Sequence, residues 1–279
     1  SVRDLYLKSA QTARALGYKG LKGTWGSGSL IENVWVDQAE VGAWVADFTT
    51  NADIYTDGLV MRGCRIRNTF ADGINYASGT RNSVVENCHI RGAGDDGIAS
   101  WASGRDNNKP TTRNQQFRYN TIECVYRAGG LGVFGGEGHK IHHNIVRDQV
   151  AGPGIRLNTI FVYESGILKG YPFGAQLIHI FDNDLLRTGA LTVFNEQAAA
   201  IELQTWYTNV ENIRFADNAI DTTAYEGIRF SRIGQVATAS FANILFTGPT
   251  FANAPFGTLI TAEASGSAAF DHAPSNAGI

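Results

Sequence analysis

The sequence is poor in charge and in long apolar runs, and each shortage excludes a class of protein. No apolar stretch approaches the roughly 20 residues that a membrane-spanning helix needs, so we expect no membrane partner. Charged residues make up 18% of the chain and the net charge is -3, which argues against the basic face of a nucleic-acid-binding protein. Low charge with 32 glycines and 11% aromatic residues is typical of a β-rich extracellular protein. We therefore expect a secreted, monomeric protein that binds no nucleic acid.

No secretion signal is visible at residues 1–4, which lack a basic segment followed by an apolar stretch. We expect either a processed mature chain or a catalytic piece of a longer protein. An all-β chain of 279 residues can form one domain, so we predict that residues 1–279 are a single domain. Residues 245–279 are rich in Ala, Gly, Ser and Pro, and we expect them to form a C-terminal cap or tail.

Cysteine is scarce, and the three residues present are an odd number. Cys64 and Cys88 are 24 residues apart and share a register within the repeat described below. Neighbouring parallel strands separate stacked Cβ atoms by about 4.8 Å, more than the roughly 3.8 Å that a disulfide prefers. We therefore predict a buried ladder of free thiols. Cys124 does not share that register, and no Cys-x-x-Cys spacing indicates a metal centre.

A short repeat runs through most of the chain. Asn or Gly comes first, and Val, Ile or Leu follows after a small step. The copies begin at Asn33, Gly63, Asn87, Asn120, Asn144, Asn183 and Asn218, at intervals of 24 to 39 residues. A second Gly, followed by Ile or Leu, lies ten residues after four of these starts, at Gly73, Gly97, Gly130 and Gly154. A fixed offset within a variable spacing is typical of a solenoid with insertions at its corners.

The repeat unit favours short strands, because it has no helical period of useful length. Asn at a corner tolerates the left-handed conformation, and its amide can bond to the Asn one turn above. Aliphatic residues stacked turn on turn would form a continuous core. We predict an all-β fold, a right-handed parallel β-helix of about eight to ten turns. The longest insertions, 103–115 and 157–177, are expected to project from its corners.

Two copies of an Asp-Gly-Ile motif carry the candidate site. Asp72 and Asp96 are 24 residues apart, so one turn of the coil would stack them with Cα atoms about 5 Å apart, and Asp95 lies beside them. Crowded carboxylates repel one another, which raises at least one pKa. Such a set can hold one protonated acid and one or two ionised bases near neutral pH, as glycosidic cleavage requires. The alternative is an acidic corner that is only solvated or that binds a cation.

The motif also imposes a structural requirement. In an unbroken strand the acids would face the core together with the Ile residues two positions later. We therefore expect a bend or bulge at Gly73 and Gly97 that turns the acids outward. The position before the Gly mark is predicted to contain Asp72, Asp96, Gly129, Pro153, Thr188 and Glu226 in successive turns.

The amino-acid sequence around the acids resembles that of a known family. Residues 68–75 and 94–101 are similar to the catalytic segments of glycoside hydrolase family 87, which contains α-1,3-glucanases and mycodextranases. Family 28 polygalacturonases share the Asp-Gly and Asp-Asp arrangement. Residues 129–132 nevertheless lack the Gly-His-Gly expected of them, and no Arg-Ile-Lys segment follows.

The resemblance implies an endo-acting, inverting hydrolase of α-1,3-linked glucan such as mutan, fungal cell-wall α-glucan or nigeran. It implies that Asp95 is the general acid and that Asp72 and Asp96 activate the water. The spacing alone leaves the stereochemistry open, because carboxylates about 5 Å apart would fit a retaining pair.

Further substrate contacts are expected near the Gly mark. Tyr76, Trp101 and Phe134 lie three or four residues past their Gly and could stack on sugar faces, with core or exterior packing as the alternative. Arg156, which shares a predicted column with Arg229, and His139 are further candidates. No metal or cofactor is expected to be required. A structural calcium site is a possibility at the Asp106-Asn107-Asn108 loop, with a solvated loop as the alternative.

Three rival functions remain open at this stage. The chain could be another β-helical polysaccharide hydrolase, polygalacturonase-like or dextranase-like, or a lyase. A lyase would need calcium-binding acids and a basic residue close by, and no Lys lies near Asp72 in the sequence. The chain could also be a non-catalytic carbohydrate-binding β-helix, in which Asp95→Asn would change nothing.

Overall fold

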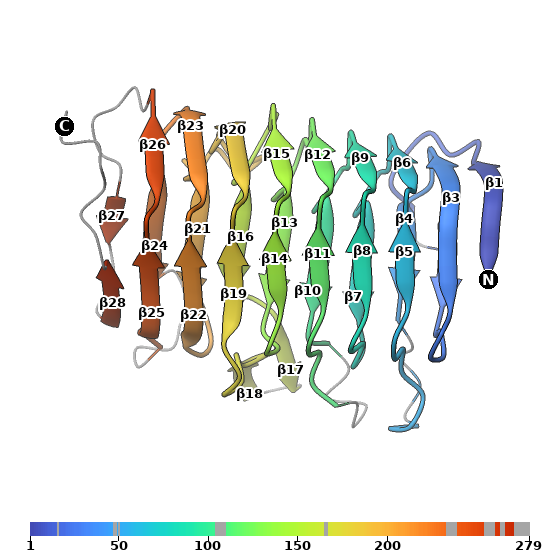
Figure 1. The fold of residues 1–279 in the computed structure, drawn as a ribbon, viewed down its shortest axis with the longest axis horizontal. Coiled ribbons are helices and arrows are strands. Elements are labelled where there is room, and N and C mark those ends of the chain that lie inside the picture. The colour runs from blue at the N-terminus through green and yellow to red at the C-terminus, as the bar shows by residue number, and fades with distance from the viewer. Residues whose placement is uncertain are drawn as a thin grey trace.

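The computed structural model describes residues 1–15, 17–46, 49, 51–103, 110–164, 167–232, 239–253, 260–262 and 266–270. Within these residues all regular structure is β-strand, and the strands stack turn upon turn into a coil (Figure 1). The near strands in Figure 1 point up, the chain returns on the far side, and it advances from right to left, so the coil is right-handed. The predicted right-handed parallel β-helix is confirmed. Among the described residues no helix has the length and apolar character to cross a membrane.

One parallel sheet of nine strands forms one wall of the coil. It contains β2 (Lys19–Gly23), β4 (Val41–Val45), β7 (Ile74–Ala77), β10 (Ile98–Trp101), β13 (Leu131–Phe134), β16 (Ile155–Asn158), β21 (Ile201–Thr205), β24 (Ile228–Arg232) and β27 (Ile260–Ala262). Each strand belongs to a different turn, so the described part of the chain makes nine turns through this wall, within the predicted eight to ten.

A second sheet of 17 strands folds around the opposite side, and its strands are also parallel. It opens with β1 (Val2–Lys8) and β3 (Leu30–Asp37). One row holds β5 (Val60–Arg62), β8 (Val84–Glu86), β11 (Gln116–Arg118), β14 (Lys140–His142), β19 (Ile178–Phe181), β22 (Val210–Ala216), β25 (Phe241–Thr247) and β28 (Gly266–Phe270). The other row holds β6 (Arg65–Arg67), β9 (His89–Arg91), β12 (Thr121–Glu123), β15 (Ile145–Arg147), β20 (Asp184–Thr188), β23 (Ala219–Thr223) and β26 (Thr250–Ala252).

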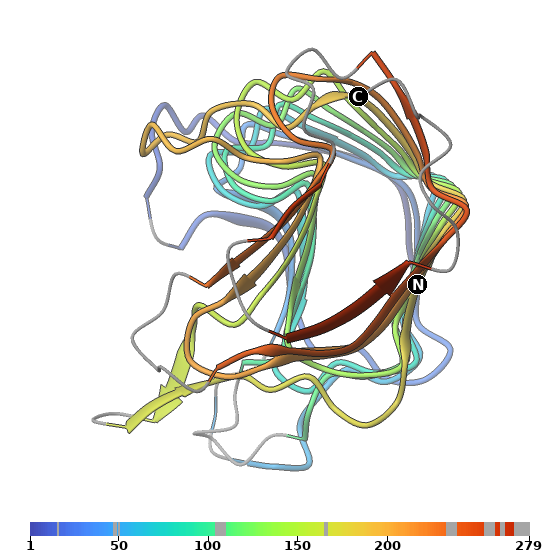
Figure 2. The same ribbon diagram turned by 90° about the vertical axis from the view of Figure 1, so that its left-hand side faces the viewer.

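Two predicted segments can be placed on this frame. The 157–177 insertion contains the antiparallel pair β17 (Val162–Glu164) and β18 (Ile167–Gly170), which projects from the coil (Figure 2). In the predicted C-terminal cap, β26, β27 and β28 continue both sheets. Residues 104–109, which include the proposed calcium ligands Asp106, Asn107 and Asn108, lie outside the described residues.

Buried aliphatic columns fill the space between the sheets. The column that follows the Gly mark contains Ile74, Ile98, Leu131, Ile155, Ile201 and Ile228, each at most 1% exposed. The predicted alignment was wrong at the fifth position of this column, where Ile201 and not Ala190 follows Ile155, so Thr188 is not in line with the acids. Residues between Thr188 and Ile201 form a loop that the spacing did not reveal.

A ladder of buried Asn side chains lines one corner of the coil. Asn120 donates to Asn144 at 3.0 Å, Asn144 to Asn183 at 2.9 Å and Asn183 to Asn218 at 2.8 Å. Cys88 continues the ladder, because its backbone N–H donates to the Asn120 side chain at 2.9 Å. The predicted register was therefore off by one residue, because Cys88 and not Asn87 aligns with Asn120. Cys64 and Cys88 are buried free thiols in neighbouring turns, as predicted.

The glycines of the mark are required by close packing and not by a positive φ. Gly42 aligns with Gly73, because Ala43 pairs with Ile74 of the next turn. A Cβ on Gly42 would lie 2.4 Å from Ile66 Cγ2 and 2.5 Å from the Gly73 carbonyl oxygen. We expect Gly42→Ala to lower the free energy of unfolding by roughly 3 kcal/mol, because backbone of one turn must move away from the next. Gly26→Ala is the control, since among the described residues no atom beyond its two chain neighbours lies within 4 Å of its Cβ position. Equal urea midpoints for the two variants would contradict this packing.

Candidate active site

The three acids lie where the chain enters the nine-stranded wall. The chain bends at Gly73 and Gly97, and β7 and β10 begin at the next residue, so the predicted bends are confirmed. Asp72 and Asp96 are turned away from the aliphatic core and into a surface cavity. Although they face away from the core, they are buried and not exposed. Asp72 is only 7% and Asp96 only 4% accessible, at the floor of the cavity.

The stacking of the acids follows from the repeat. The backbone N–H of Asp96 donates to Asp72 Oδ1 at 3.2 Å, and one turn later the N–H of Gly129 donates to Asp96 Oδ1 at 2.8 Å. Asn75 Nδ2 donates to Asp72 Oδ2 at 3.1 Å. One carboxylate oxygen from each of Asp72, Asp95 and Asp96 lies within 4.8 Å of the others. Each buried carboxylate is thus held by the turn that follows it.

Asp95 differs from the other two acids in its surroundings. Its side chain is 29% exposed, and its Oδ2 accepts a hydrogen bond from Arg14 at 2.8 Å. Arg14 lies 81 residues earlier, in the irregular segment between β1 and β2, and its side chain is 42% exposed. A guanidinium on one member of the cluster makes the three carboxylates a poorer cation site and leaves them suited to proton transfer.

Burial raises the pKa of the two acids at the cavity floor, Asp72 and Asp96. Burial, assisted by the charge of Asp95, raises the pKa of Asp72 to about 7. Burial is also the main reason that the pKa of Asp96 rises well above its ordinary value, and the charges of Asp95 and Asp72 add to it. The hydrogen bond from Asn75 acts in the opposite direction on Asp72. Asp72 and Asp96 therefore take up protons nearer neutrality than an isolated carboxyl group does.

Two cavities, of about 300 and 560 Å³, meet at the acids. Asp95, Asp96, Phe134 and Phe161 line both of them. The smaller extends toward the earlier turns of the coil, and the larger extends toward the later turns and Trp206. The acids thus lie in the middle of a cleft that follows the coil axis.

Two of the predicted aromatic contacts lie in this cleft. Trp101 and Phe134 are paired in register on β10 and β13 and line the smaller cavity. The Trp101 ring lies 5.1 Å from that of Phe161, and Phe134 lies 5.2 Å from the same ring. This aromatic cluster forms one wall of the cleft beside the acids.

Tyr76 and His139 do not reach the cleft. Tyr76 is fully buried and its hydroxyl donates to the Val84 carbonyl at 3.1 Å, so sugar stacking does not agree with its position. It lies two residues after Ile74 in β7 and therefore faces the core. His139 is 1% exposed, contacts Ser100 Oγ at 3.3 Å, and its pKa is lowered to about 3 by burial.

Arg156, a predicted substrate contact, lines the larger cavity. It shares an outward-facing column with Arg229, and Glu202 lies between them. Its Nη2 bonds Glu202 Oε2 at 3.0 Å, so its charge is already paired. Several other cleft residues were not predicted from the sequence. Arg14, Lys19, Phe161 and Trp206 come from segments that the repeat does not mark. Trp44 and Asn75 are paired in register on β4 and β7, two residues after Gly42 and Gly73, and both line the smaller cavity.

The fold and the acids together define a class, that of β-helical proteins with a carboxylate cluster in an axial cleft. Residues 17–235 match the family described as α-1,3-glucanase catalytic domain D2, and the chain belongs to this family, the catalytic domain of glycoside hydrolase family 87. No curated protein matches the chain.

Solved structures show the same fold. The Agl-KA catalytic domain is 30% identical, with a TM-score of 0.83 over 96% of this chain and 52% of that chain. The catalytic unit of a thermostable GH87 α-1,3-glucanase from Streptomyces thermodiastaticus strain HF3-3 is 22% identical, with a TM-score of 0.68 over 94% and 53%. A GH87 α-1,3-glucanase variant in complex with tetrasaccharides is 24% identical, with a TM-score of 0.76 over 89% and 44%. The chain thus spans about half the length of these relatives.

Proposed function

We propose that this β-helix is the catalytic part of a secreted, endo-acting glycoside hydrolase that cleaves α-1,3-glucosidic linkages in glucan. The convergence of three carboxylates within 4.8 Å at the middle of an axial cleft is the observation that carries the proposal. Family membership supports the linkage. So does a match of spacing: related α-1,3-glucanase domains were solved with alanine at three aspartates separated by 23 and 1 residues, the same intervals as Asp72, Asp95 and Asp96.

Asp95 is assigned as the general acid. It is the most exposed of the three acids and lines both cavities, so it can reach a glycosidic oxygen that lies across their junction. It must leave its ion pair with Arg14 and take up a proton from solvent before it can protonate the leaving oxygen. Because the Arg14 side chain is 42% exposed and belongs to an irregular segment, a glucan chain that enters the cleft can displace it.

Asp72 and Asp96 are assigned to the attacking water. They form the cavity floor, where a water between them can be held by two carboxylates. A base with a pKa of about 7, as burial gives Asp72, is well matched to catalysis near neutral pH. Two bases around one water account for a third acid and favour inversion, whereas a retaining enzyme needs only two carboxyl groups.

The cleft geometry supports attack within a chain. Cavities extend from the acids in both axial directions, so sugar units can lie on either side of the cleaved bond. Trp101, Phe134 and Phe161 offer ring surface beside the acids, where the apolar faces of glucose units can pack. Neutral glucose units need no counter-charge, which agrees with the pairing of Arg156 by Glu202.

Hydrolysis of a polysaccharide panel tests this function. We expect the purified chain to release reducing ends from α-1,3-glucan and nigeran and not from dextran or polygalacturonate. Because inversion places water opposite the leaving group, proton NMR should show β-anomeric product first. Initial α-anomer would overturn the assigned roles while leaving the linkage intact. Activity on polygalacturonate alone would instead favour the family 28-like alternative.

A further inference from the structure

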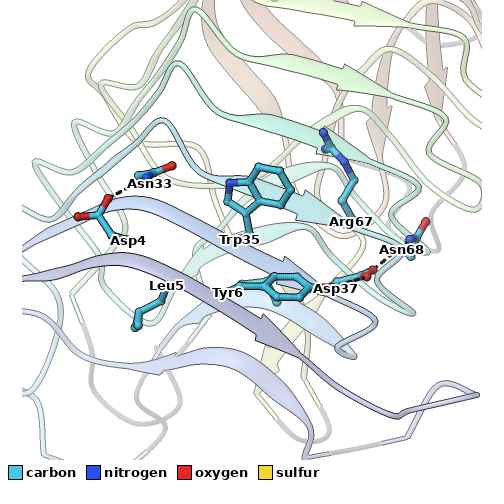
Figure 3. A pocket seen from close by; sticks show the side chains of 9 residues that line it. Asp4, Leu5, Tyr6, Asn33, Trp35, Asp37, Arg67 and Asn68 are labelled. Carbon is cyan, nitrogen blue, oxygen red and sulfur yellow. Dashed lines mark hydrogen bonds between the residues drawn. The ribbon is translucent and has the colours of Figure 1, made fainter.

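A second hollow lies on the outer face of the 17-stranded sheet, over its first turns (Figure 3). Its volume is about 640 Å³, and none of the residues that line it lines either cavity of the cleft. The features used below are two aromatic rings and a polar rim. Tyr6 and Trp35 supply the rings, and Asp4, Asn33, Asp37 and Asn68 supply the rim (Figure 3). We call it the Tyr6–Trp35 hollow.

The two rings are exposed and held in a fixed arrangement. Tyr6 on β1 and Trp35 on β3 are paired in register and are 58% and 45% exposed. Their centroids are 6.4 Å apart and their planes meet at 89°. The Arg65 guanidinium lies 4.7 Å from the centre of the Trp35 ring and braces it from the next turn. Exposed rings that are already ordered lose little entropy when a ligand packs against them.

The rim presents planar polar groups at the edge of these rings. Asn33 Nδ2 donates to Asp4 Oδ1 at 2.7 Å, and Asn68 Nδ2 donates to Asp37 Oδ1 at 3.0 Å. The Tyr6 hydroxyl donates to Asp37 Oδ2 at 3.3 Å. Each carboxylate and amide keeps further hydrogen-bonding capacity for hydroxyl groups. An apolar floor with a few fixed polar groups is the usual composition of a site for a small polar ligand.

The charge of the hollow indicates a neutral ligand. Asp4 and Asp37 are balanced by Arg65, which touches Trp35, and by Arg67, which lines the hollow. The charges at the hollow are therefore balanced, and no net charge is present to attract a nucleic acid or an acidic peptide. A pyranose chain meets the requirements, because its C–H faces pack on aromatic rings while its hydroxyls bond the rim.

We propose that the Tyr6–Trp35 hollow is a carbohydrate-binding surface that holds a neutral glucan chain outside the catalytic cleft. The identity of the polymer as α-1,3-glucan rests on the function proposed above, whereas the presence of a binding surface does not. Holding an insoluble chain at a second place keeps the cleft near new linkages, since the second contact occurs at a raised effective concentration.

The test compares a double variant, Tyr6→Ala with Trp35→Ala, with the unchanged chain. We expect its binding to insoluble α-1,3-glucan, measured by depletion from solution, to weaken about tenfold. Hydrolysis of the insoluble polymer should fall about fivefold, and hydrolysis of soluble nigero-oligosaccharides should stay within twofold. Tyr119→Ala is the control, because Tyr119 is 50% exposed but lies outside the hollow. Trp35→Phe alone should retain most of the binding, which separates a lost ring from a disturbed fold.

The outcomes separate the two proposals. Glucan binding that depends on Trp35 in a chain without hydrolysis would sustain the surface and overturn the proposed function. Hydrolysis with unchanged binding and unchanged turnover of insoluble glucan in the double variant would overturn the surface alone. Sedimentation could also show that the unchanged chain dimerises and the double variant does not, while both bind glucan equally. The hollow would then be a protein contact, and the proposed carbohydrate-binding surface would be overturned.

Discussion

Asp95→Asn is expected to lower kcat on α-1,3-glucan by about 10³-fold, because an amide cannot protonate the leaving oxygen and general acid catalysis contributes between 10² and 10⁴. The coil should stay folded, since the ion pair between Asp95 and Arg14 joins two side chains that are 29% and 42% exposed and contributes little stability. Reducing-end release and circular dichroism measure the two effects. Product formation from a substrate with a good leaving group should be affected less.

Asp148→Asn is the matched control for this substitution. Asp148 also forms an ion pair with an arginine, Arg187, at the surface of the coil, and its side chain is 38% exposed. It lies outside both cavities of the cleft, so the control should keep full activity. Unchanged hydrolysis in Asp95→Asn would remove it from the role of acid. Absence of hydrolysis in the unchanged chain, with binding intact in both, would instead support a non-catalytic carbohydrate-binding coil.

Asp72→Asn is expected to lower activity and to raise stability in a pH-dependent way. The pKa of Asp72 is about 7 in the folded chain, against an ordinary value of 3.8. The folded state therefore binds the proton more tightly, and this stability is complete below about pH 4 and is lost as pH rises through 7. An amide avoids that loss, so at pH 8 the variant's free energy of unfolding should exceed that of the unchanged chain by a few kcal/mol at most. Its unfolding temperature should rise accordingly. Near pH 4 the difference should vanish.

The hydrogen bonds around the residue permit this exchange. An amide oxygen can still accept from the Asp96 N–H, as Asp72 Oδ1 does. Asn75 now donates to Asp72 Oδ2, but its own Oδ1 has no partner among the described residues, so a flip of its amide can accept from the new NH₂ group. Thermal unfolding at pH 4, 6 and 8 measures the effect. A stability difference that is the same at all three values would contradict the raised pKa, and activity within threefold would contradict the role as base.

The acids could be found from the sequence because their spacing equals one turn of the coil. Asp72 and Asp96 each accept a hydrogen bond from a backbone N–H of the following turn. Each precedes a glycine, because close packing against the next turn leaves no room for a Cβ there. The alignment failed where a loop changed the turn length, at Ala190, and where the corner shifted by one residue, at Asn87. A period of two within β7 places Tyr76 in the core with Ile74, so its distance from the Gly mark does not indicate a position in the cleft.

The coil, the free thiol ladder and the pairing of Asp72 with Asp96 follow from the sequence, because each depends on contacts between equivalent positions one turn apart. The folded structure sets what surrounds them. Arg14 reaches Asp95 across 81 residues, and Phe161 closes the aromatic wall from an insertion. It also decided that the acids are buried at a cavity floor, which is the physical cause of the raised pKa of Asp72. Such contacts join non-equivalent positions, and no repeat in the sequence encodes them.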